Sequence, residues 1–251
     1  MMQALVILPT YNEVGNLAPM VEAILEQGDM FDVLVIDDGS PDGTGLLAEH
    51  LKGLYHGRVE VIHRQGKLGL ATAYLTGFRY GLVKGYDYLF EMDADFSHNP
   101  LYLPRFIQAI QQQNADVVLG SRYVEGGGVV RWSWHRRLIS RGGSLYAGLM
   151  LNLPVRDVTG GFKCFRRRVL ESVDLETVES SGYGFQIEMT YRAVDAGFRV
   201  VEVPIVFEER REGVSKMSPG IFAEAFWMVA KMRLAQSLRR DRQPAGNRLR
   251  P

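Results

Sequence analysis

The chain has 251 residues, 46% of them hydrophobic, and its 29 basic and 29 acidic residues give a formal net charge of zero. This length suits one large domain or two small ones with a substantial core. A zero net charge gives no support for nucleic acid as a partner. The single cysteine, Cys164, excludes an internal disulfide framework and fits a small apolar side chain in a reducing compartment.

The sequence offers no segment for secretion or for crossing a membrane. The N-terminus runs directly into the strand-like residues 4–8, without a signal peptide. The longest apolar stretch, residues 221–232, is interrupted by Glu224 and Lys231 and falls short of the roughly 18 residues that a span requires. We therefore expect a cytoplasmic protein that is soluble or peripherally bound to a membrane.

Strand and helix patterns alternate through the first half of the chain. Short aliphatic or β-branched runs predict strands at 4–8, 32–37, 58–63, 87–93 and 115–119. Apolar residues at helical spacing predict helices at 13–27, 43–54, 69–84 and 100–113, the last opened by Asn99-Pro100. The alternation predicts βαβ units around a mostly parallel sheet.

The pattern changes after Arg122. Residues 125–128 predict a mobile glycine-rich loop, and 157–162 predict a turn into a short strand. Helices are expected at 135–151 and 186–196, and a strand at 199–207 broken at Pro204. We expect a catalytic domain over 1–217, an amphipathic helix over 218–238 and a basic, disordered tail over 239–251.

Two predicted strands end in acidic residues. Asp93-Ala94-Asp95 follows one apolar run, and Asp37-Asp38 follows another. Carboxylates one residue apart suit a hard divalent cation that can share its ligands with a diphosphate. Because ligands of an open α/β sheet bind beyond the carboxyl ends of its strands, this pattern predicts a nucleotide-sugar site. Asp95 is the stronger candidate for direct metal contact, Asp93 for ribose or metal, and Ser97 for a further oxygen.

The loops after the first two strands supply candidate nucleotide contacts. Tyr11 can stack on a base, and Glu13 can accept hydrogen bonds from a base or ribose. Asp38 suits a base edge or a ribose hydroxyl, and Gly39 permits close backbone approach. A purely structural interpretation is also open: a helix-entry turn with Asn12 as the cap, followed by turn residues. A dinucleotide fingerprint is excluded, since Gly-x-Gly-x-x-Gly does not follow the first strand.

Basic residues predict contacts with phosphate. Arg122 ends the fifth predicted strand, where a guanidinium can hold phosphate through two hydrogen bonds. Residues 131–141 combine two tryptophans with four arginines and no acid, which suits an anionic head group beside an apolar chain. Each feature alone is equally compatible with a surface arginine or a basic helix face. His98 is expected to be structural.

Several motifs together resemble the inverting family 2 glycosyltransferases, and among them the dolichol- and polyprenol-phosphate mannose synthases. They are Pro-Thr-Tyr-Asn-Glu, Val-Ile-Asp-Asp-Gly-Ser-Pro-Asp-Gly-Thr, Met-Asp-Ala-Asp, Gly-Ser-Arg-Tyr and Val-Thr-Gly-Gly-Phe-Lys, within residues 3–220. The resemblance implies a GT-A fold, GDP-mannose as the donor, Mg²⁺ or Mn²⁺, and a polyprenyl or dolichyl monophosphate as the acceptor. It leaves open a membrane-anchoring partner subunit.

The resemblance also implies roles for individual residues. The nucleotide is expected at Pro9, Tyr11, Glu13, Ile36 and Asp38, the donor and metal at Asp93 and Ala94, and the metal at Asp95, with Ser97 as a further candidate. Acceptor phosphate is expected at Arg122, with Arg136, Arg137 and Ser140 on the basic segment. Residues 208–216 resemble the mobile loop of the family, which places Arg210 and Lys216 on the donor diphosphate or the acceptor phosphate.

The chain departs from the family in three respects. Some relatives have Gln at the position of Ser97, and some carry transmembrane helices after the catalytic domain. The Gln-x-x-Arg-Trp signature of processive synthases is absent, because Arg131-Trp132 lacks the Gln. Two alternatives remain: a polyprenyl-phosphate glucosyl or N-acetylglucosaminyl transferase that uses a UDP-sugar, and a catalytically silent member that binds lipid or a partner.

Overall fold

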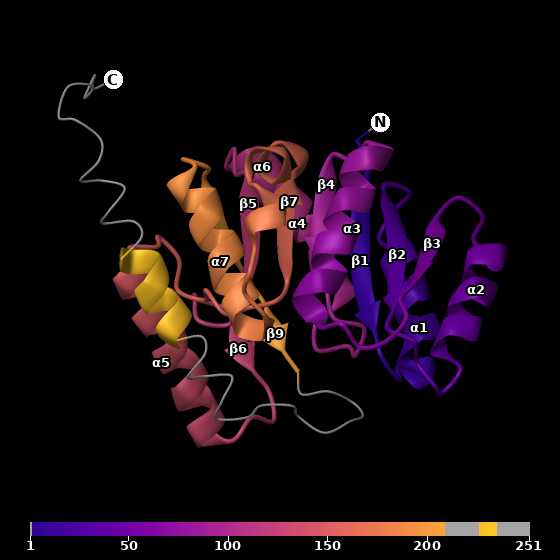
Figure 1. The fold of residues 1–251 in the computed structure, drawn as a ribbon, viewed down its shortest axis with the longest axis horizontal. Coiled ribbons are helices and arrows are strands. Elements are labelled where there is room, and N and C mark those ends of the chain that lie inside the picture. Colours follow the sequence, from indigo (N-terminus) through magenta and orange to yellow (C-terminus); the bar gives the residue numbers. More distant parts are fainter. Residues whose placement is uncertain (1, 209–225, 235–251) are drawn as a thin grey trace.

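A computed structural model describes residues 2–208 and 226–234. Its centre is a seven-stranded sheet in the order β3-β2-β1-β4-β7-β5-β8, with helices on both faces (Figure 1). In this sheet β7 runs antiparallel to both of its neighbours, and the other pairs are parallel. A second, two-stranded sheet joins β6 and β9. The predicted α/β fold with a mostly parallel sheet is therefore confirmed.

The elements follow the chain in the predicted alternation. The strands are β1 (Ala4–Thr10), β2 (Phe31–Asp37), β3 (Val59–His63), β4 (Tyr88–Glu91), β5 (Val117–Ser121), β6 (Gly128–Val129), β7 (Lys163–Arg166), β8 (Val200–Pro204) and β9 (Val206–Phe207). The α-helices are α1 (Val14–Leu25), α2 (Thr44–Leu54), α3 (Leu70–Lys84), α4 (Leu103–Gln112), α5 (Trp134–Leu151), α6 (Arg167–Ser172) and α7 (Gly182–Asp195), with 3₁₀ turns at Pro100–Tyr102 and Leu175–Thr177.

Alternating side chains of the strands build two hydrophobic layers. In β1, Leu5 and Ile7 join the layer under α3, α5, α6 and α7, whereas Val6 and Leu8 join the layer under α1, α2 and α4. Both layers are apolar because strands in the middle of a parallel sheet are covered on both faces. Cys164 is fully buried in β7 as the expected apolar filler, and burial raises the pKa of its thiol well above the usual value.

The second half of the chain departs from the predictions in detail. The glycine-rich segment 125–128, predicted as a mobile loop, ends in the first residue of β6, since Gly128 pairs with Val206 of β9. The short helix α6 was not predicted, and α7 begins four residues earlier than expected. Asn99 caps the turn at Pro100 as its sequence indicated, because its side chain accepts the Leu101 N–H at 3.0 Å.

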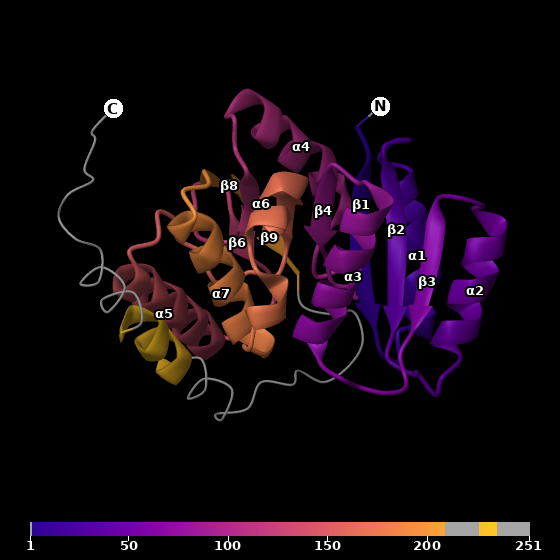
Figure 2. The same cartoon turned by 45° about the horizontal axis from the view of Figure 1, so that its top comes forward.

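Residues 226–234 are helical and pack beside α5 (Figures 1 and 2). The ring of Phe226 stacks on that of Tyr146 with centroids 4.6 Å apart, and Val229 is buried in the same layer as α5. The rest of the expected helix over 218–238, its boundary with the domain at 217 and the tail over 239–251 lie outside the described residues. In the described part of the chain, none of the helices has the length and apolar character needed to cross a bilayer.

Candidate active site

The parallel strands bring their carboxyl ends to one edge of the sheet. Thr10 pairs with Asp37 across β1 and β2, Asp37 pairs with His63 across β2 and β3, and Ile7 pairs with Glu91 across β1 and β4. The loops that follow these strands therefore start side by side. They carry the predicted nucleotide residues and the Asp93-Ala94-Asp95 motif to a common edge, as expected for a parallel sheet.

The first two loops hold each other through the start of α1. The Glu13 N–H donates to Thr44 Oγ1 at 2.9 Å, and the Val14 N–H donates to Asp42 Oδ2 at 3.2 Å. The N-terminus of α1 is thus capped by one side chain from the loop after β2 and one from the first residue of α2. Asn12 as the cap is wrong: Glu13 occupies that position, and Asn12 has a left-handed φ of 61°. The cap from a distant loop fixes Tyr11 and Glu13 relative to Asp38.

Asp38 is held by an arginine that sequence reasoning missed. The Arg64 Nε donates to Asp38 Oδ1 at 2.6 Å, and the Arg64 guanidinium also donates to Thr72 Oγ1 at 2.7 Å. Gly39, the residue after Asp38, has a φ of 68°, and a Cβ there would sit 3.4 Å from the Arg64 carbonyl oxygen. Arg64 follows β3, so the rule that singled out the ends of the other strands could have found it.

The remaining residues predicted to bind the nucleotide differ in their exposure to solvent. Tyr11 is half-buried, with Lys67 Nζ 4.6 Å from its ring centroid, so a flat apolar face and a cation lie together there. Pro9 is also partly exposed at the end of β1. Ile36 is fully buried in the core, so its side chain supports β2 from within.

The candidate metal residues follow β4 and are tightly constrained. Asp95 is buried and accepts the Ser97 N–H at 3.0 Å, while Ala94 is buried between the two carboxylates. The side chain of Asp93 is 27% exposed and accepts the Tyr74 hydroxyl at 3.3 Å. Burial, and then the nearby Asp93 carboxylate, raise the pKa of Tyr74 well above its usual value, so its hydroxyl stays protonated as a donor.

His98 is structural, as predicted. Its Nδ1 accepts the Asp93 N–H at 3.1 Å, and its ring stacks on Phe162 with centroids 5.0 Å apart. This contact fixes the backbone that carries Asp93. The ring is also buried, with 2% of its side chain exposed.

The candidate metal ligands fit a cation whose remaining coordination positions are filled by a substrate. Among residues 2–208 and 226–234, no three His, Cys, Asp or Glu side chains cluster as a metal site would require. The two carboxylates, however, have a buried hydroxyl beside them: Ser97 Oγ has no hydrogen-bond partner in the described chain. A buried polar atom without a partner is costly and needs an explanation, which an oxygen-seeking cation such as Mg²⁺ or Mn²⁺ supplies. Asp93, Asp95 and Ser97 would hold it.

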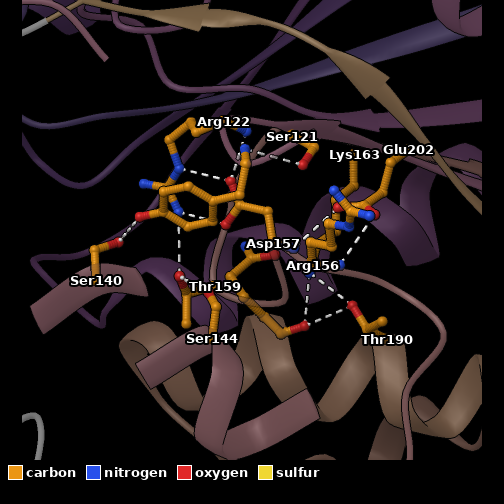
Figure 3. Close-up of polar contacts among 12 residues, drawn as sticks. Ser121, Arg122, Ser140, Ser144, Arg156, Asp157, Thr159, Lys163, Thr190 and Glu202 are labelled. Atoms are coloured by element: carbon orange, nitrogen blue, oxygen red, sulfur yellow. Dashed lines mark hydrogen bonds and ion pairs between the residues drawn. The ribbon is translucent and has the colours of Figure 1, made fainter. Parts of the chain in front are cut away.

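Arg122 lies at the end of β5 in a network with a buried aspartate (Figure 3). Asp157 Oδ2 accepts the Arg122 N–H at 2.8 Å and its Nε at 2.7 Å, and Asp157 Oδ1 accepts Nη2 at 2.6 Å. The backbone N–H groups of Arg156 and Asp157 donate to Glu202 at 2.9 Å, which anchors this loop to β8. Asp157 was not predicted, because nothing in its spacing marks it as a partner of Arg122.

The same network reaches α5, where the other phosphate candidates lie. Arg122 Nη2 donates to Thr159 Oγ1 at 3.1 Å, and Thr159 is 3.0 Å from Ser144 of α5. The Tyr123 hydroxyl donates to Ser140 at 2.7 Å. Ser140 is therefore brought to the Arg122 region as the sequence indicated (Figure 3).

The two arginines of α5 that were predicted to bind phosphate lie in different surroundings. The Arg136 guanidinium stacks over Trp132 at 4.2 Å, and the Arg122 guanidinium lies 5.3 Å from the same ring. Arg137 is exposed and donates to the Val129 carbonyl oxygen at 3.2 Å. Arg210 and Lys216, the loop candidates, lie outside the described residues.

Two buried charged side chains under the site were also missed. Glu91 ends β4 opposite Lys163 of β7, and both side chains are fully buried. Lys163 Nζ donates to the Gln186 carbonyl oxygen at 2.6 Å and to Thr190 Oγ1 at 3.0 Å. Burial raises the pKa of Glu91 to about 7 and lowers that of Lys163 to about 8. In the sequence, Glu91 looks like part of an apolar strand, and Lys163, which faces it across the β4–β7 pair, lies 72 residues away.

Known proteins resemble this chain over most of its length. The sequence profile of glycosyl transferase family 2 matches residues 5–174. The polyprenol monophosphomannose synthase of Mycolicibacterium smegmatis is 48% identical over 240 residues, which cover 96% of this chain and 90% of that protein. The undecaprenyl-phosphate mannosyltransferase of Micrococcus luteus is 48% identical over 234 residues, covering 93% of this chain and 95% of that protein.

Solved structures support the fold independently. Glucosyl-3-phosphoglycerate synthase from Mycobacterium tuberculosis, crystallised with Mn²⁺, UDP-glucose and phosphoglyceric acid, aligns with a TM-score of 0.69 at 17% identity. The alignment covers 92% of this chain and 80% of that one. The predicted GT-A fold is confirmed, and the chain belongs to glycosyltransferase family 2, where it is similar to polyprenyl-phosphate mannosyltransferases.

Proposed function

We propose that the protein transfers mannose from GDP-mannose to a polyprenyl or dolichyl-type monophosphate, with inversion at the anomeric carbon and with Mg²⁺ or Mn²⁺. The observation that carries this proposal is the arrangement at the carboxyl edge of the sheet. Asp93 and Asp95 lie between the nucleotide loops after β1 and β2 and the cationic region around Arg122. The 48% identity to two proteins named for polyprenyl-phosphate mannose transfer indicates the sugar and the acceptor.

Different residues of the chain bind the nucleoside, bind the cation and position these groups. Tyr11, Glu13 and Asp38 bind the nucleoside, with Arg64 and the cap of α1 fixing their positions. Asp93 and Asp95 would hold the cation, which when bound would neutralise charge on the leaving diphosphate. Tyr74 and His98 fix the side chain and the backbone of Asp93. Preorganised contacts of this kind lower the barrier because they need no rearrangement during the reaction.

The acceptor requires little help in becoming a nucleophile. A phosphate monoester has a second pKa near 6 and is largely a dianion at neutral pH. The site must instead orient it and balance its charge. Arg122 orients the phosphate and balances its charge, together with Arg136, Arg137 and Ser140 of α5. The plane of its guanidinium is fixed by Asp157. Arg210 and Lys216 are assigned to the donor diphosphate on the family resemblance alone.

The donor sugar and base are tested by direct comparison. Purified protein is given radiolabelled GDP-mannose, UDP-glucose or UDP-N-acetylglucosamine with a polyprenyl monophosphate and either Mg²⁺ or Mn²⁺. We expect label in the organic phase with GDP-mannose, none without metal, and a β-linked product by NMR. Preferred transfer from a UDP-sugar would replace the donor assignment with the alternative glucosyl or N-acetylglucosaminyl transferase.

A further inference from the structure

The segment before α5 turns one of its two tryptophans inward. Trp132 is 8% exposed, whereas Trp134, two residues later, is 73% exposed. The chain reaches Trp132 through Arg131, whose φ of 63° lies in the left-handed region that residues other than glycine rarely adopt. Such a conformation persists only where the surrounding structure holds it in place. The inward position of Trp132 is therefore imposed by its contacts.

The contacts that hold Trp132 come from β9. The Val130 N–H donates to the Phe207 carbonyl oxygen at 2.9 Å, which continues the pairing of β6 with β9. The Phe207 ring lies edge-on to the ring of Trp132, with centroids 5.3 Å apart, and edge-on to His98, with centroids 5.5 Å apart. His98 accepts the Asp93 N–H. A continuous set of ring contacts thus connects Trp132 to the candidate metal residues.

Two arginines that were predicted to bind phosphate lie against the Trp132 ring. The guanidinium carbon of Arg136 is 4.2 Å from the ring centroid, and that of Arg122 is 5.3 Å away. Attraction between a cation and an aromatic face favours both contacts. Asp157 balances the charge of Arg122 (Figure 3), but the chain from Glu125 to Asp157 has no acidic residue between its ends. The surroundings of the ring are therefore rich in positive charge.

The indole N–H of Trp132 lacks an acceptor. Its Nε1 atom is buried and has no hydrogen-bond partner in the part of the chain that the structure describes. A buried indole N–H usually finds a partner, and a buried donor without one costs free energy. The two guanidinium groups beside the ring cannot supply it, because arginine donates hydrogen bonds and accepts none. A group of donors and positive charge without an acceptor suits an anion with several oxygens.

We propose that Trp132 donates its indole N–H to a phosphate oxygen of the acceptor, an isoprenyl monophosphate, beside Arg122 and Arg136. A phosphate monoester has three strong acceptor oxygens, so it can serve the indole and both guanidinium groups. Because Nε1 is closed to water in the structure, the phosphate reaches it when the partly exposed Arg136 side chain shifts.

Two sources could supply a phosphate oxygen here, the acceptor and the donor diphosphate. We assign the acceptor, because the diphosphate is expected at the cation of Asp93 and Asp95, on the far side of Phe207 and His98 from Trp132. This choice of ligand rests on the proposed function. The missing acceptor at Nε1 does not, and it can be tested without any transfer of sugar.

NMR of the indole N–H groups tests the hydrogen bond directly. The chain has three tryptophans, so the full chain with isotope-labelled indole nitrogen gives three such signals. Trp132→Phe identifies the signal of Trp132, and Trp134→Phe and Trp227→Phe identify the other two, so the assignment stands even if one variant fails to fold. We expect farnesyl monophosphate to move the Trp132 signal downfield, as a hydrogen bond to an anion does. Farnesol, which has the same chain without phosphate, and GDP with Mg²⁺ should not.

Transfer kinetics provides a second readout. Trp132→Phe keeps an aromatic ring for the two guanidinium groups and removes the N–H. The KM for polyprenyl monophosphate should rise roughly tenfold or more, as for the loss of a hydrogen bond to a charged group, while the KM for GDP-mannose stays within about twofold of the wild type. The matched control is Trp134→Phe, the same change at an exposed position, which should leave both KM values within about twofold.

Four results would overturn the proposal. Farnesyl monophosphate at saturation could leave the Trp132 signal in place, which would exclude the hydrogen bond. Farnesol could move the signal equally, which would indicate an apolar contact instead. GDP with Mg²⁺ could move it in place of the monophosphate, which would assign Trp132 to the donor. Normal KM values for a folded Trp132→Phe would exclude a part in acceptor binding. A downfield shift with farnesyl monophosphate in a protein that transfers no mannose would instead support this proposal and refute the proposed function.

Discussion

Asp157→Asn probes the contact on which the cationic side of the site depends. Asp157 is fully buried and accepts three hydrogen bonds from Arg122, whose side chain is only 6% exposed. Removing one partner of a buried ion pair leaves an uncompensated charge and costs about 3–5 kcal/mol. Because asparagine keeps the shape and one acceptor oxygen, we expect the lower end, about 3 kcal/mol of unfolding free energy.

Urea unfolding followed by tryptophan emission measures this loss, since the Trp132 ring lies 5.3 Å from the Arg122 guanidinium. The matched control is Glu176→Gln, which breaks an ion pair with Arg79 of similar length, 2.8 Å, but with both side chains substantially exposed. It should change the unfolding free energy by less than about 1 kcal/mol. Equal small losses for both variants would refute the view that Asp157 compensates a buried charge.

Three further predictions concern neighbouring residues. Arg122→Lys keeps the charge but loses the planar fork, so transfer should fall at least roughly tenfold; a loss below about threefold would mean that Arg122 does not act on phosphate. Ser97→Ala should raise the Mn²⁺ concentration needed for half-maximal transfer without lowering the melting temperature, whereas an unchanged Mn²⁺ requirement would remove Ser97 from the metal site. Lys163→Met should destabilise the fold by about 3 kcal/mol or more, and Glu91→Gln/Lys163→Met should recover part of that loss; no recovery in a thermal or urea titration would mean that the two charges are not coupled.

The sequence predicted the first half of the fold well, because each signal there is local. Short aliphatic or β-branched runs predicted β1 to β5 within a few residues, and Asn99-Pro100 marked a helix entry that the structure contains. The antiparallel insertion of β7 between β4 and β5 could not be predicted from the sequence. A four-residue strand, Lys163–Arg166, carries no information on which distant strands will receive it.

The candidate site was predicted residue by residue but not as a network. Strand ends singled out Asp38, Asp95 and Arg122, and the structure brings them to one side of the sheet. Their partners Arg64 and Asp157 were missed, since each pair joins segments 26 and 35 residues apart through side chains. Such pairing depends on tertiary packing, which no local pattern encodes. The same limit applies to β6, where glycine composition indicated a mobile loop although Gly128 at the end of that segment pairs with β9.

The central claim is that the carboxylates after β4 support mannosyl transfer to a lipid phosphate. It is tested most directly by the transfer of label from GDP-mannose to polyprenyl monophosphate by the wild type and by Asp95→Asn, with unfolding curves for both. We predict Mn²⁺- or Mg²⁺-dependent transfer by the wild type and none by a variant that is equally folded. Transfer by Asp95→Asn at near wild-type rate, with the same metal dependence, would contradict the claim.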